Sequence, residues 1–262
     1  MKRRLVLITI FGWLLGGCAG QQNSLHVFAG AAGKPAIEEA VRLFEEDYQV
    51  KVDVTYGGSG EVLSQILLSQ RGDVYIPGSD DYMDKAENKG VVDGRTRRII
   101  CDLKPSIVIR KANPKGINEL EDLTQPGLKI AIGTPGAVCL GDIALEVFRQ
   151  AGIEEKVAPN IVTYAHNCQH LLTLLKLKQV DAIIGWDFYE HLAPQEVEGV
   201  ELPQEIAQSR NIPAAVISFS KQKKLADKFV RFITGAKGKE IFEKYGYTIV
   251  SKRNRSATDA HR

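Results

Sequence analysis

The sequence predicts an α/β fold with mostly parallel sheets. Short apolar segments alternate with longer segments in which apolar residues recur at helical spacing, and turns of glycine and other small residues separate them. Strands that alternate with helices in this way are typical of βαβ units, in which a helix joins parallel strands. With 44% hydrophobic residues among 262, the chain can build one large or two modest domains.

The first unit begins with an apolar strand at residues 25–28 and a turn of alanine and glycine at residues 29–33. Pro35 then stands in the first turn of a helix, where its missing N–H costs nothing. The apolar face of that helix includes Ile37 and Phe44. Strand, small-residue turn and helix therefore follow one another directly.

The unit then repeats. Residues 50–56 alternate as a strand, residues 57–60 form a glycine-rich turn, and residues 62–67 carry the next helical face. A third short strand is expected at residues 71–76, and residues 77–80 cap the helix that follows.

Later segments continue the alternation up to a charged, aperiodic tail at residues 251–262. Strands are expected at residues 105–110, 129–132, 161–164, 182–185 and 214–219, and helices at residues 141–151, 166–178, 225–233 and 237–245. No linker rich in serine, proline or glycine divides the chain. If two lobes exist, the chain must cross between them in short, ordered segments.

The N-terminus predicts export. Lys2, Arg3 and Arg4 precede an apolar run that ends in Gly16-Gly17-Cys18, which is the order of a cleaved signal peptide. That run is shorter than the roughly 20 residues that span a bilayer. The site resembles a bacterial lipobox, which implies that residues 1–17 are removed and that Cys18 carries the lipid.

The charge balance argues against nucleic acid as a partner. Lysine and arginine number 34 and acidic residues 32, and three of the positive charges lie in the predicted signal. A nearly neutral mature chain lacks the basic footprint of nucleic-acid binding. No second stretch approaches bilayer length, so we expect the lipid alone to hold the folded part at a membrane.

Four turns of small residues precede predicted helix starts. These turns are residues 30–33, 57–60, 134–141 and 165–167. A helix start presents unpaired backbone N–H groups and a partial positive charge of about half a unit, so several converging starts would bind an anion. Glycine turns are also common in any α/β fold, and the pattern alone does not name the anion.

Enzyme and cofactor signatures are missing. Residues 57–61 lack the second glycine of a nucleophile elbow, and the sequence contains no HExxH, P-loop or GxGxxG motif. We therefore expect neither an enzyme nor a cofactor, and an enzyme on this fold is the least favoured alternative.

The three cysteines that follow Cys18 leave several readings open. Cys101, Cys139 and Cys168 allow one disulfide at most. Cys139 and Cys168 with nearby histidines would suffice for zinc. On a helix, however, His166 and His170 share a face from which Cys168 points away, so we expect no metal site. A Cys139–Cys168 disulfide stays open.

Five segments, in this order, resemble the periplasmic molybdate-binding proteins of ABC transporters. They are residues 26–32, 56–60, 72–76, 132–135 and 241–249, and the resemblance runs from Leu25 to Val250. It implies a two-lobed type II periplasmic-binding-protein fold, each lobe a mostly parallel sheet flanked by helices. Lobe one would comprise residues 24–103 and 211–250, and lobe two residues 104–210.

The resemblance also implies where an anion would be bound. Its contacts in this sequence would be Ala31, Ala32, Gly58, Ser59, Gly60, Leu140, Cys168, Gly185 and Trp186. Two hydroxyl donors of the family pattern are missing, because Ala32 replaces a serine and Gly185 a tyrosine. Ser59 remains as the hydroxyl donor. Trp186 either lines the cleft or packs in a core.

The predicted function is therefore that of a monomeric, lipid-anchored solute-binding protein that faces the periplasm or the exterior. It would capture a small tetrahedral oxyanion, molybdate or tungstate first among them, and deliver it to the membrane permease of an ABC importer. The alternative is a metal ion or another small solute bound on the same fold through Cys139 and Cys168.

Overall fold

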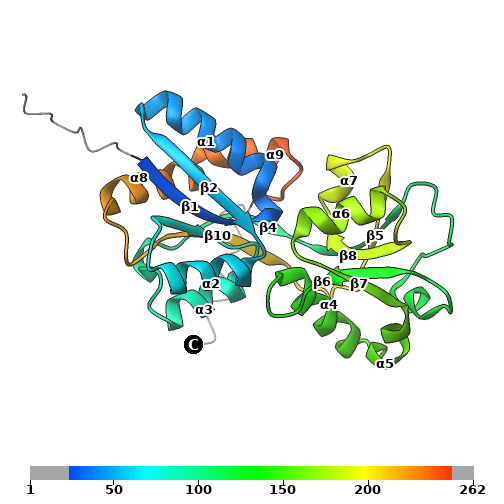
Figure 1. Ribbon diagram of the computed structural model, residues 1–262. Helices are drawn as coiled ribbons and strands as arrows, with labels where there is room; N and C mark the ends of the chain where they lie inside the picture. The colour runs from blue at the N-terminus through cyan, green and yellow to red at the C-terminus, as the bar shows by residue number, and fades with distance from the viewer. Residues whose placement is uncertain (1–23, 250–262) are drawn as a thin grey trace, which may run out of the picture.

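The computed structural model describes residues 24–249. The predicted signal peptide, Cys18 and the predicted tail lie outside the described residues. Within this range no helix is both long and apolar enough to cross a membrane. The described chain forms two α/β lobes that lie side by side (Figure 1).

Each lobe is built on one five-stranded sheet. The first sheet has the order β2 (Lys51–Gly57), β1 (Ser24–Gly30), β3 (Val74–Ile76), β10 (Arg210–Val216) and β4 (Arg98–Leu103). The second has the order β7 (Ile161–Ala165), β6 (Ile130–Gly133), β8 (Ala182–Trp186), β5 (Pro105–Arg110) and β9 (Val197–Glu201).

In each sheet one strand runs against the other four. Strand β10 pairs antiparallel with both β3 and β4, and β5 does the same with β8 and β9. The remaining neighbours pair in parallel. The reversed strands are the ones by which the chain enters each lobe after a crossing. The predicted fold class, with mostly parallel sheets, is confirmed.

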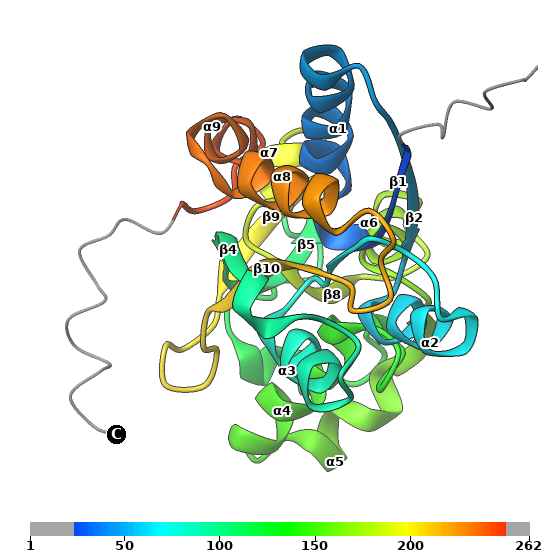
Figure 2. The ribbon, with the colours of Figure 1, turned by 90° about the vertical axis from the view of Figure 1, so that its left-hand side faces the viewer.

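Helices cover both faces of each sheet (Figures 1 and 2). In the first lobe α1 (Lys34–Tyr48), α8 (Lys223–Thr234) and α9 (Ala236–Lys244) lie on one face, and α2 (Ser59–Ser69) and α3 (Asp80–Asn88) on the other. In the second lobe α6 (Cys168–Lys176) and α7 (Tyr189–Leu192) lie opposite α4 (Cys139–Gln150) and α5 (Glu154–Val157). Short 3-10 turns are η1 (Ala31–Gly33), η2 (Gly94–Thr96), η3 (Leu120–Thr124) and η4 (Ala158–Asn160).

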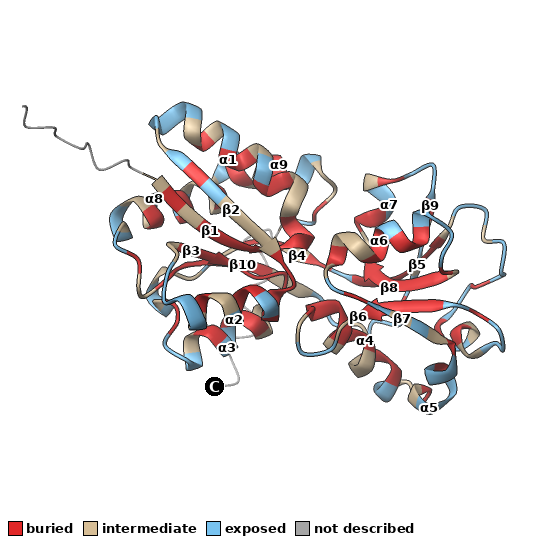
Figure 3. Cartoon of the chain, in the orientation of Figure 1, coloured by how far each residue is buried: buried red, intermediate tan, exposed pale blue. Residues whose placement is uncertain are grey.

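The core follows the apolar periodicity of the sequence. Buried residues occupy the strands and the inward faces of the helices, and exposed ones the outer faces (Figure 3). Helix α1 buries Ile37 and Phe44 completely, as its pattern predicted. Phe44 packs edge-on against Phe229 of α8, with ring centroids 5.0 Å apart. The N-terminal and C-terminal parts of the chain thus share one core.

Two strands were not predicted, and one begins earlier than expected. Strands β4 and β9 are sheet edges whose sequences mix charged and apolar residues, so they lack an apolar run. Strand β10 begins at Arg210 instead of residue 214 because Pro213 lies at a shift of register opposite β4. Proline is tolerated at such irregularities, although it usually indicates that a strand has ended.

The chain crosses between the sheets twice, as short ordered segments. The first crossing is Lys104 alone, between β4 and β5, and its carbonyl accepts a hydrogen bond from the Asp187 amide at 2.9 Å. The second comprises residues 202–209, between β9 and β10. The lobe boundaries at 103/104 and 210/211 stay a prediction.

Candidate functional site

The first wall of the candidate site is the turn between β2 and α2. Ser59 is the first residue of α2 and is only 1% exposed. Its Oγ accepts a hydrogen bond from the Gly78 amide at 2.9 Å, and its carbonyl oxygen accepts one from the Tyr75 hydroxyl at 2.8 Å. Strand β3 and the turn after it thus hold Ser59 in place.

Replacing Tyr75 with phenylalanine tests this support. The variant loses one buried hydrogen bond, so its free energy of unfolding should fall. We expect a decrease of only about 1 kcal/mol, because the Ser59 carbonyl also points along its own helix. Urea unfolding of the variant beside Tyr164→Phe, whose side chain is half exposed, measures the difference. Equal unfolding midpoints for the two variants would show that the Tyr75 hydroxyl does not stabilise the fold.

The two lobes meet at the start of α2. The Ala137 carbonyl of lobe two accepts hydrogen bonds from the amides of Gly60, at 2.9 Å, and Glu61, at 3.4 Å. A Cβ on Gly58 would lie 2.3 Å from that carbonyl oxygen, and one on Gly60 would lie 2.4 Å from the Gly136 oxygen. Glycine is required at both positions because two backbones approach each other directly.

Polar side chains link the lobes around this contact. The Tyr82 hydroxyl of α3 donates to Asp142 Oδ2 of α4 at 2.8 Å. Arg210, at the start of β10, forms a 2.7 Å ion pair with Glu146 of α4. Partly exposed pairs of this kind contribute little energy, and their effect here is to orient α4 against lobe one.

Two cysteine sulfurs lie behind the contact. Cys139 is the first residue of α4 and Cys168 the first of α6, and both thiols are free and buried. A Cβ on Gly78 would lie 3.1 Å from Cys139 Sγ, 3.3 Å from Ala32 Cβ and 3.4 Å from Ser59 Oγ. The Cys139 side chain of lobe two therefore reaches the turns of lobe one.

The two thiols differ in acidity. A hydrogen bond from Cys168 lowers the pKa of Cys139, and the hydroxyls of Ser59 and Ser79 lower it further. The same contact with Cys139, together with burial, raises the pKa of Cys168 well above its usual value. Hydrogen bonds to the charged form of a thiol favour that form. If one thiol of the pair ionises, it is Cys139.

Aromatic side chains close the back of the site. The Tyr189 hydroxyl donates to the Cys168 carbonyl at 2.7 Å, and the Tyr247 hydroxyl donates to the Ala32 carbonyl at 2.5 Å. Trp186 is fully buried beside the Cys168 sulfur. Within residues 24–249 its indole Nε1 has no hydrogen-bond partner of good geometry.

The structure brings most of the predicted contact residues together. Ala32, Ser59 and the Cys139 sulfur all lie against Gly78. Cys168 and Trp186 are buried in lobe two. Ala31 precedes Ala32 in η1, and Leu140 follows Cys139 in α4; both are buried. Gly58 and Gly60 face the loop before α4.

Gly185 is the exception among these positions. A Cβ there would lie 2.8 Å from the Val108 side chain and 3.0 Å from the ring of Tyr189. A tyrosine could not be accommodated at this position without moving both neighbours. The aromatic groups near Cys168 are instead Trp186 and Tyr189.

Ser79 is a site residue that the sequence analysis missed. Its position before α3 suggested only a helix cap, but its side chain makes no capping hydrogen bond. It is 0% exposed, and its hydroxyl lies beside Cys139 without a well-directed partner in the described range. A serine before two aspartates resembles any N-cap, so no local signal distinguished it.

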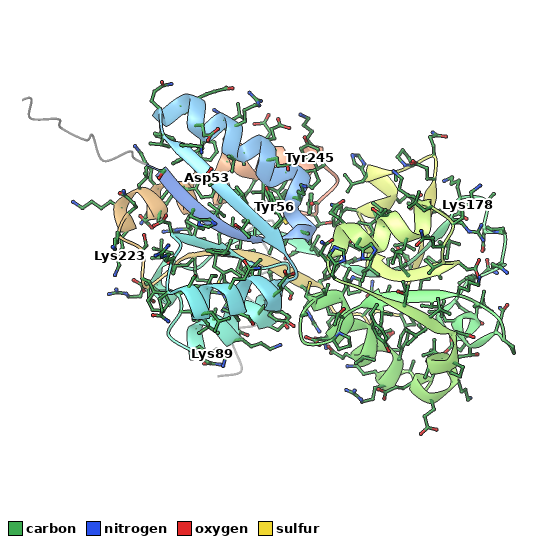
Figure 4. The ribbon with its side chains drawn as sticks, viewed as in Figure 1. Asp53, Tyr56, Lys89, Lys178, Lys223 and Tyr245 are labelled. Atoms are coloured by element: carbon green, nitrogen blue, oxygen red, sulfur yellow. The ribbon has the colours of Figure 1, made fainter. Side chains whose placement is uncertain are left out.

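The electrostatics of the site come from helix starts. Helices α2, α4 and α6 all begin here, and each start carries a partial positive charge. The lysines Lys89, Lys223 and Lys178 project from surfaces away from the place where the lobes meet (Figure 4). An anion at the site would be held by oriented dipoles and neutral donors.

Few side chains are available to bind a metal ion, the alternative function that the sequence left open. Among residues 24–249 no group of three or more His, Cys, Asp or Glu side chains is arranged to hold a metal ion. The tilted rings of His166 and His170 lie together, with centroids 4.2 Å apart. Cys168 is buried at the start of α6.

Two lobes, two crossings and a donor-lined contact between the lobes define a solute-binding protein. Residues 25–248 match the family described as bacterial extracellular solute-binding protein, and the chain belongs to that family.

Relatives of the chain include proteins named for molybdate and for sulfate. It is 26% identical over 241 residues to a putative binding protein of Haemophilus influenzae, with 92% of this chain and 97% of the relative covered. It is 25% identical over 226 residues to the molybdate-binding protein ModA of Mycobacterium tuberculosis H37Rv, covering 86% and 84%. The resemblance to molybdate-binding proteins is confirmed.

The solved structure of the sulfate-binding protein SubI from Mycobacterium tuberculosis shares the fold. It superposes with a TM-score of 0.78 at 18% identity, and 88% of each chain is covered. The fold of this chain is therefore also that of a protein named for sulfate.

Proposed function

We propose that this protein is the lipid-anchored solute-binding component of an ABC importer and captures a small tetrahedral oxyanion, molybdate or tungstate first among them. Cys18 would carry the lipid, and the folded part would act as a monomer that delivers its ligand to the membrane permease. The anion contacts would be those predicted from the sequence, with Ser79 added and Gly185 left out.

One observation carries the proposal: the starts of three helices, and buried donors, meet where the lobes touch. Amides of α2 bond to Ala137, two residues before α4. Thr134, on the way to α4, bonds to the carbonyl of Ala165, three residues before α6. Ser59, Ser79 and Trp186 add side-chain donors. A fully deprotonated oxyanion offers only acceptors, which suits a site that offers mainly donors.

The mechanism we propose is lobe closure on the anion. When the lobes are in contact, the Ala137 carbonyl oxygen accepts hydrogen bonds from the Gly60 and Glu61 amides. An anion that enters would accept from such amides and from the Ser59 hydroxyl, and its negative charge would be stabilised by the helix starts. Binding is non-covalent and needs no catalytic step.

A thermal-shift screen of the chain starting at Ala19 tests the ligand class. Molybdate, tungstate, sulfate and phosphate are compared at matched ionic strength, with and without a thiol reductant. Binding to the native state raises the melting temperature by mass action, and we expect the largest rise with molybdate or tungstate. A rise with sulfate or phosphate alone would reassign the anion, and no rise with any of the four would contradict the proposal.

Replacing Ser59 with alanine tests the site itself. We expect binding of the anion to weaken by about 1–3 kcal/mol, because a donor to a desolvated charge is lost, which is roughly 5- to 150-fold in Kd. The variant also loses the acceptor for the buried Gly78 amide, so its melting temperature should fall.

Calorimetric titration well below the melting temperature separates these two effects. Ser64→Ala is the matched control, because Ser64 lies on the same helix and its hydroxyl bonds only to the Gly60 carbonyl. Equal affinities for Ser59→Ala and Ser64→Ala would remove Ser59 from the site.

A further inference from the structure

Two buried tyrosine hydroxyls bond to the backbone of predicted anion contacts, one in each lobe. The Tyr247 hydroxyl donates to the Ala32 carbonyl at 2.5 Å, and the Tyr189 hydroxyl donates to the Cys168 carbonyl at 2.7 Å. Tyr247 is 3% exposed and Tyr189 0%. The elements that they hold, η1 of lobe one and α6 of lobe two, are in contact. The same arrangement therefore supports two segments that meet across the lobes.

The direction of these two carbonyls matters to an anion. A carbonyl oxygen is an acceptor with a partial negative charge, so it repels an anion beside it. In a trans peptide the carbonyl and the N–H of the next residue point in opposite directions. A hydroxyl bonded to the carbonyl therefore turns the amide of Gly33, or that of Gln169, away from the tyrosine. Gln169 is the second residue of α6, which leaves its N–H without a partner inside the helix.

Phe188 joins the two tyrosines. Its ring stacks on that of Tyr247, with centroids 4.1 Å apart, and meets that of Tyr189 edge-on at 5.0 Å. Phe188 follows β8 in lobe two, whereas Tyr247 follows α9 in lobe one. The two segments are closely packed, because a Cβ on Gly246 would lie 2.7 Å from that of His191. The stacked rings therefore belong to the interface between the lobes.

We propose that Tyr247 and Tyr189 are positioning residues of the oxyanion site and that Phe188 couples them across the lobes. Neither tyrosine hydroxyl would touch the anion. Tyr247 holds the turn at Ala32, Tyr189 holds the start of α6, and their common contact with Phe188 aligns the two when the lobes close. This role rests on the proposed function.

Closure of the lobes links the two hydroxyls to affinity. With the lobes in contact, Ala32 is 1% exposed and Cys168 3%, and separation of the lobes would admit water to both segments. In a variant without the hydroxyl, closure would remove water from a carbonyl and replace it with no hydrogen bond, which costs free energy. The wild type avoids this cost because each tyrosine lies in the same lobe as the carbonyl that it holds.

Two conservative variants test the tyrosines. Tyr247→Phe and Tyr189→Phe keep the rings and lose the hydroxyls. Molybdate, or the oxyanion that the thermal-shift screen selects, is titrated calorimetrically into the chain starting at Ala19, well below the melting temperature. We expect Kd to rise about fivefold in each variant, the equivalent of one hydrogen bond. A purely structural role would lower the melting temperature and leave Kd unchanged, so a wild-type Kd in either variant would overturn the proposal.

Tyr245→Phe is the matched control. Tyr245 lies two residues before Tyr247, and its hydroxyl bonds to Glu39 Oε2 at 2.9 Å, within lobe one. The control variant also loses one hydroxyl from this segment, but no predicted anion contact loses its partner. We expect its Kd to equal that of the wild type. A rise in Kd as large as that of Tyr247→Phe would mean that the Ala32 carbonyl does not set the affinity, and would contradict the proposal.

A second pair of variants tests the coupling. Phe188→Leu removes a ring that stacks on Tyr247 from the other lobe, whereas Phe242→Leu removes one that meets Tyr247 at 5.0 Å from α9, in the same lobe. We expect Phe188→Leu to raise Kd about two- to tenfold, the usual contribution of an aromatic pair. Phe242→Leu should lower the melting temperature and leave Kd unchanged. Equal Kd values for the two variants would overturn the coupling, and Phe188→Met gives the same test if Phe188→Leu does not fold.

The wild-type titration separates this positioning role from the proposed function. If the wild type binds one of the four oxyanions and the tyrosine variants bind it equally well, the positioning role is excluded and the proposed function stands. If the wild type binds none of the four, the proposed function and the positioning role are both excluded.

Discussion

Replacing Gly60 with alanine should weaken anion binding by about 100-fold and leave both lobes folded. The added Cβ would lie 2.4 Å from the Gly136 carbonyl oxygen and 3.1 Å from the Ala137 Cα, both backbone atoms of the opposite lobe. No side-chain rotation relieves such an overlap. Overpacking of this kind costs about 1–3 kcal/mol. Two of the three nearest atoms belong to the opposite lobe, and the third is in the Tyr82 ring of lobe one, at 2.9 Å, so most of the cost falls on closure.

The substitution should weaken binding but should not destabilise the helix. Gly60 is the second residue of α2, where alanine has the higher helix propensity. The unfolding midpoint of Gly60→Ala should therefore change little or rise while affinity falls. Small-angle X-ray scattering should show a larger radius of gyration, because the lobes can no longer touch at this point.

The control is Gly94→Ala, also in lobe one. Its Cβ would meet only the Glu87 side chain, at an ordinary 3.4 Å, so affinity and radius of gyration should stay unchanged. Calorimetry with the anion that the thermal-shift screen selects measures both variants. Wild-type affinity in Gly60→Ala would mean that binding does not require this contact between the lobes.

Replacing Phe44 with alanine should destabilise the protein by about 3–5 kcal/mol, the usual range for a buried phenylalanine. Phe44 is 0% exposed. Its ring packs against Phe229 at 5.0 Å and Phe232 at 5.3 Å, both on α8. The cavity would lie between the N-terminal and C-terminal parts of lobe one, where neighbouring helices cannot easily collapse into it.

Guanidinium unfolding followed by circular dichroism measures this change. Leu68→Ala is the control, because Leu68 is 87% exposed and its truncation should stay within about 0.5 kcal/mol of the wild type. Trp186 fluorescence reports lobe two in the same samples. A loss below about 1 kcal/mol for Phe44→Ala would show that α1 and α8 do not share a tightly packed core.

The elements of the fold were largely predictable because their patterns are local. Pro35 and an apolar face that ends at Phe44 predict helix α1. A wholly apolar run predicts strand β8. The edge strands β4 and β9 were missed, since an edge strand needs only one buried face and tolerates charge. The start of β10 was not predicted because Pro213 usually ends a strand. Here it lies at a shift of register that depends on the partner strand β4.

The candidate site was predictable only in part. Ser59 and the glycines beside it form a glycine-rich turn that the sequence predicts. The structure places that turn between the lobes. Ser79 carried no distinguishing signal, and Gly185 proved to face Val108 and Tyr189. Which side chains face one another across the cleft depends on two lobes far apart along the chain.

The sequence by itself determined the alternation of strands and helices and the small-residue turns at the helix starts, because each depends on residues close together in the chain. Only the tertiary structure decided that the Cys139 sulfur reaches Gly78 of the other lobe and that Gly60 meets a carbonyl of the other lobe. These contacts join turns some 60 to 80 residues apart, and only the packing of both lobes specifies them.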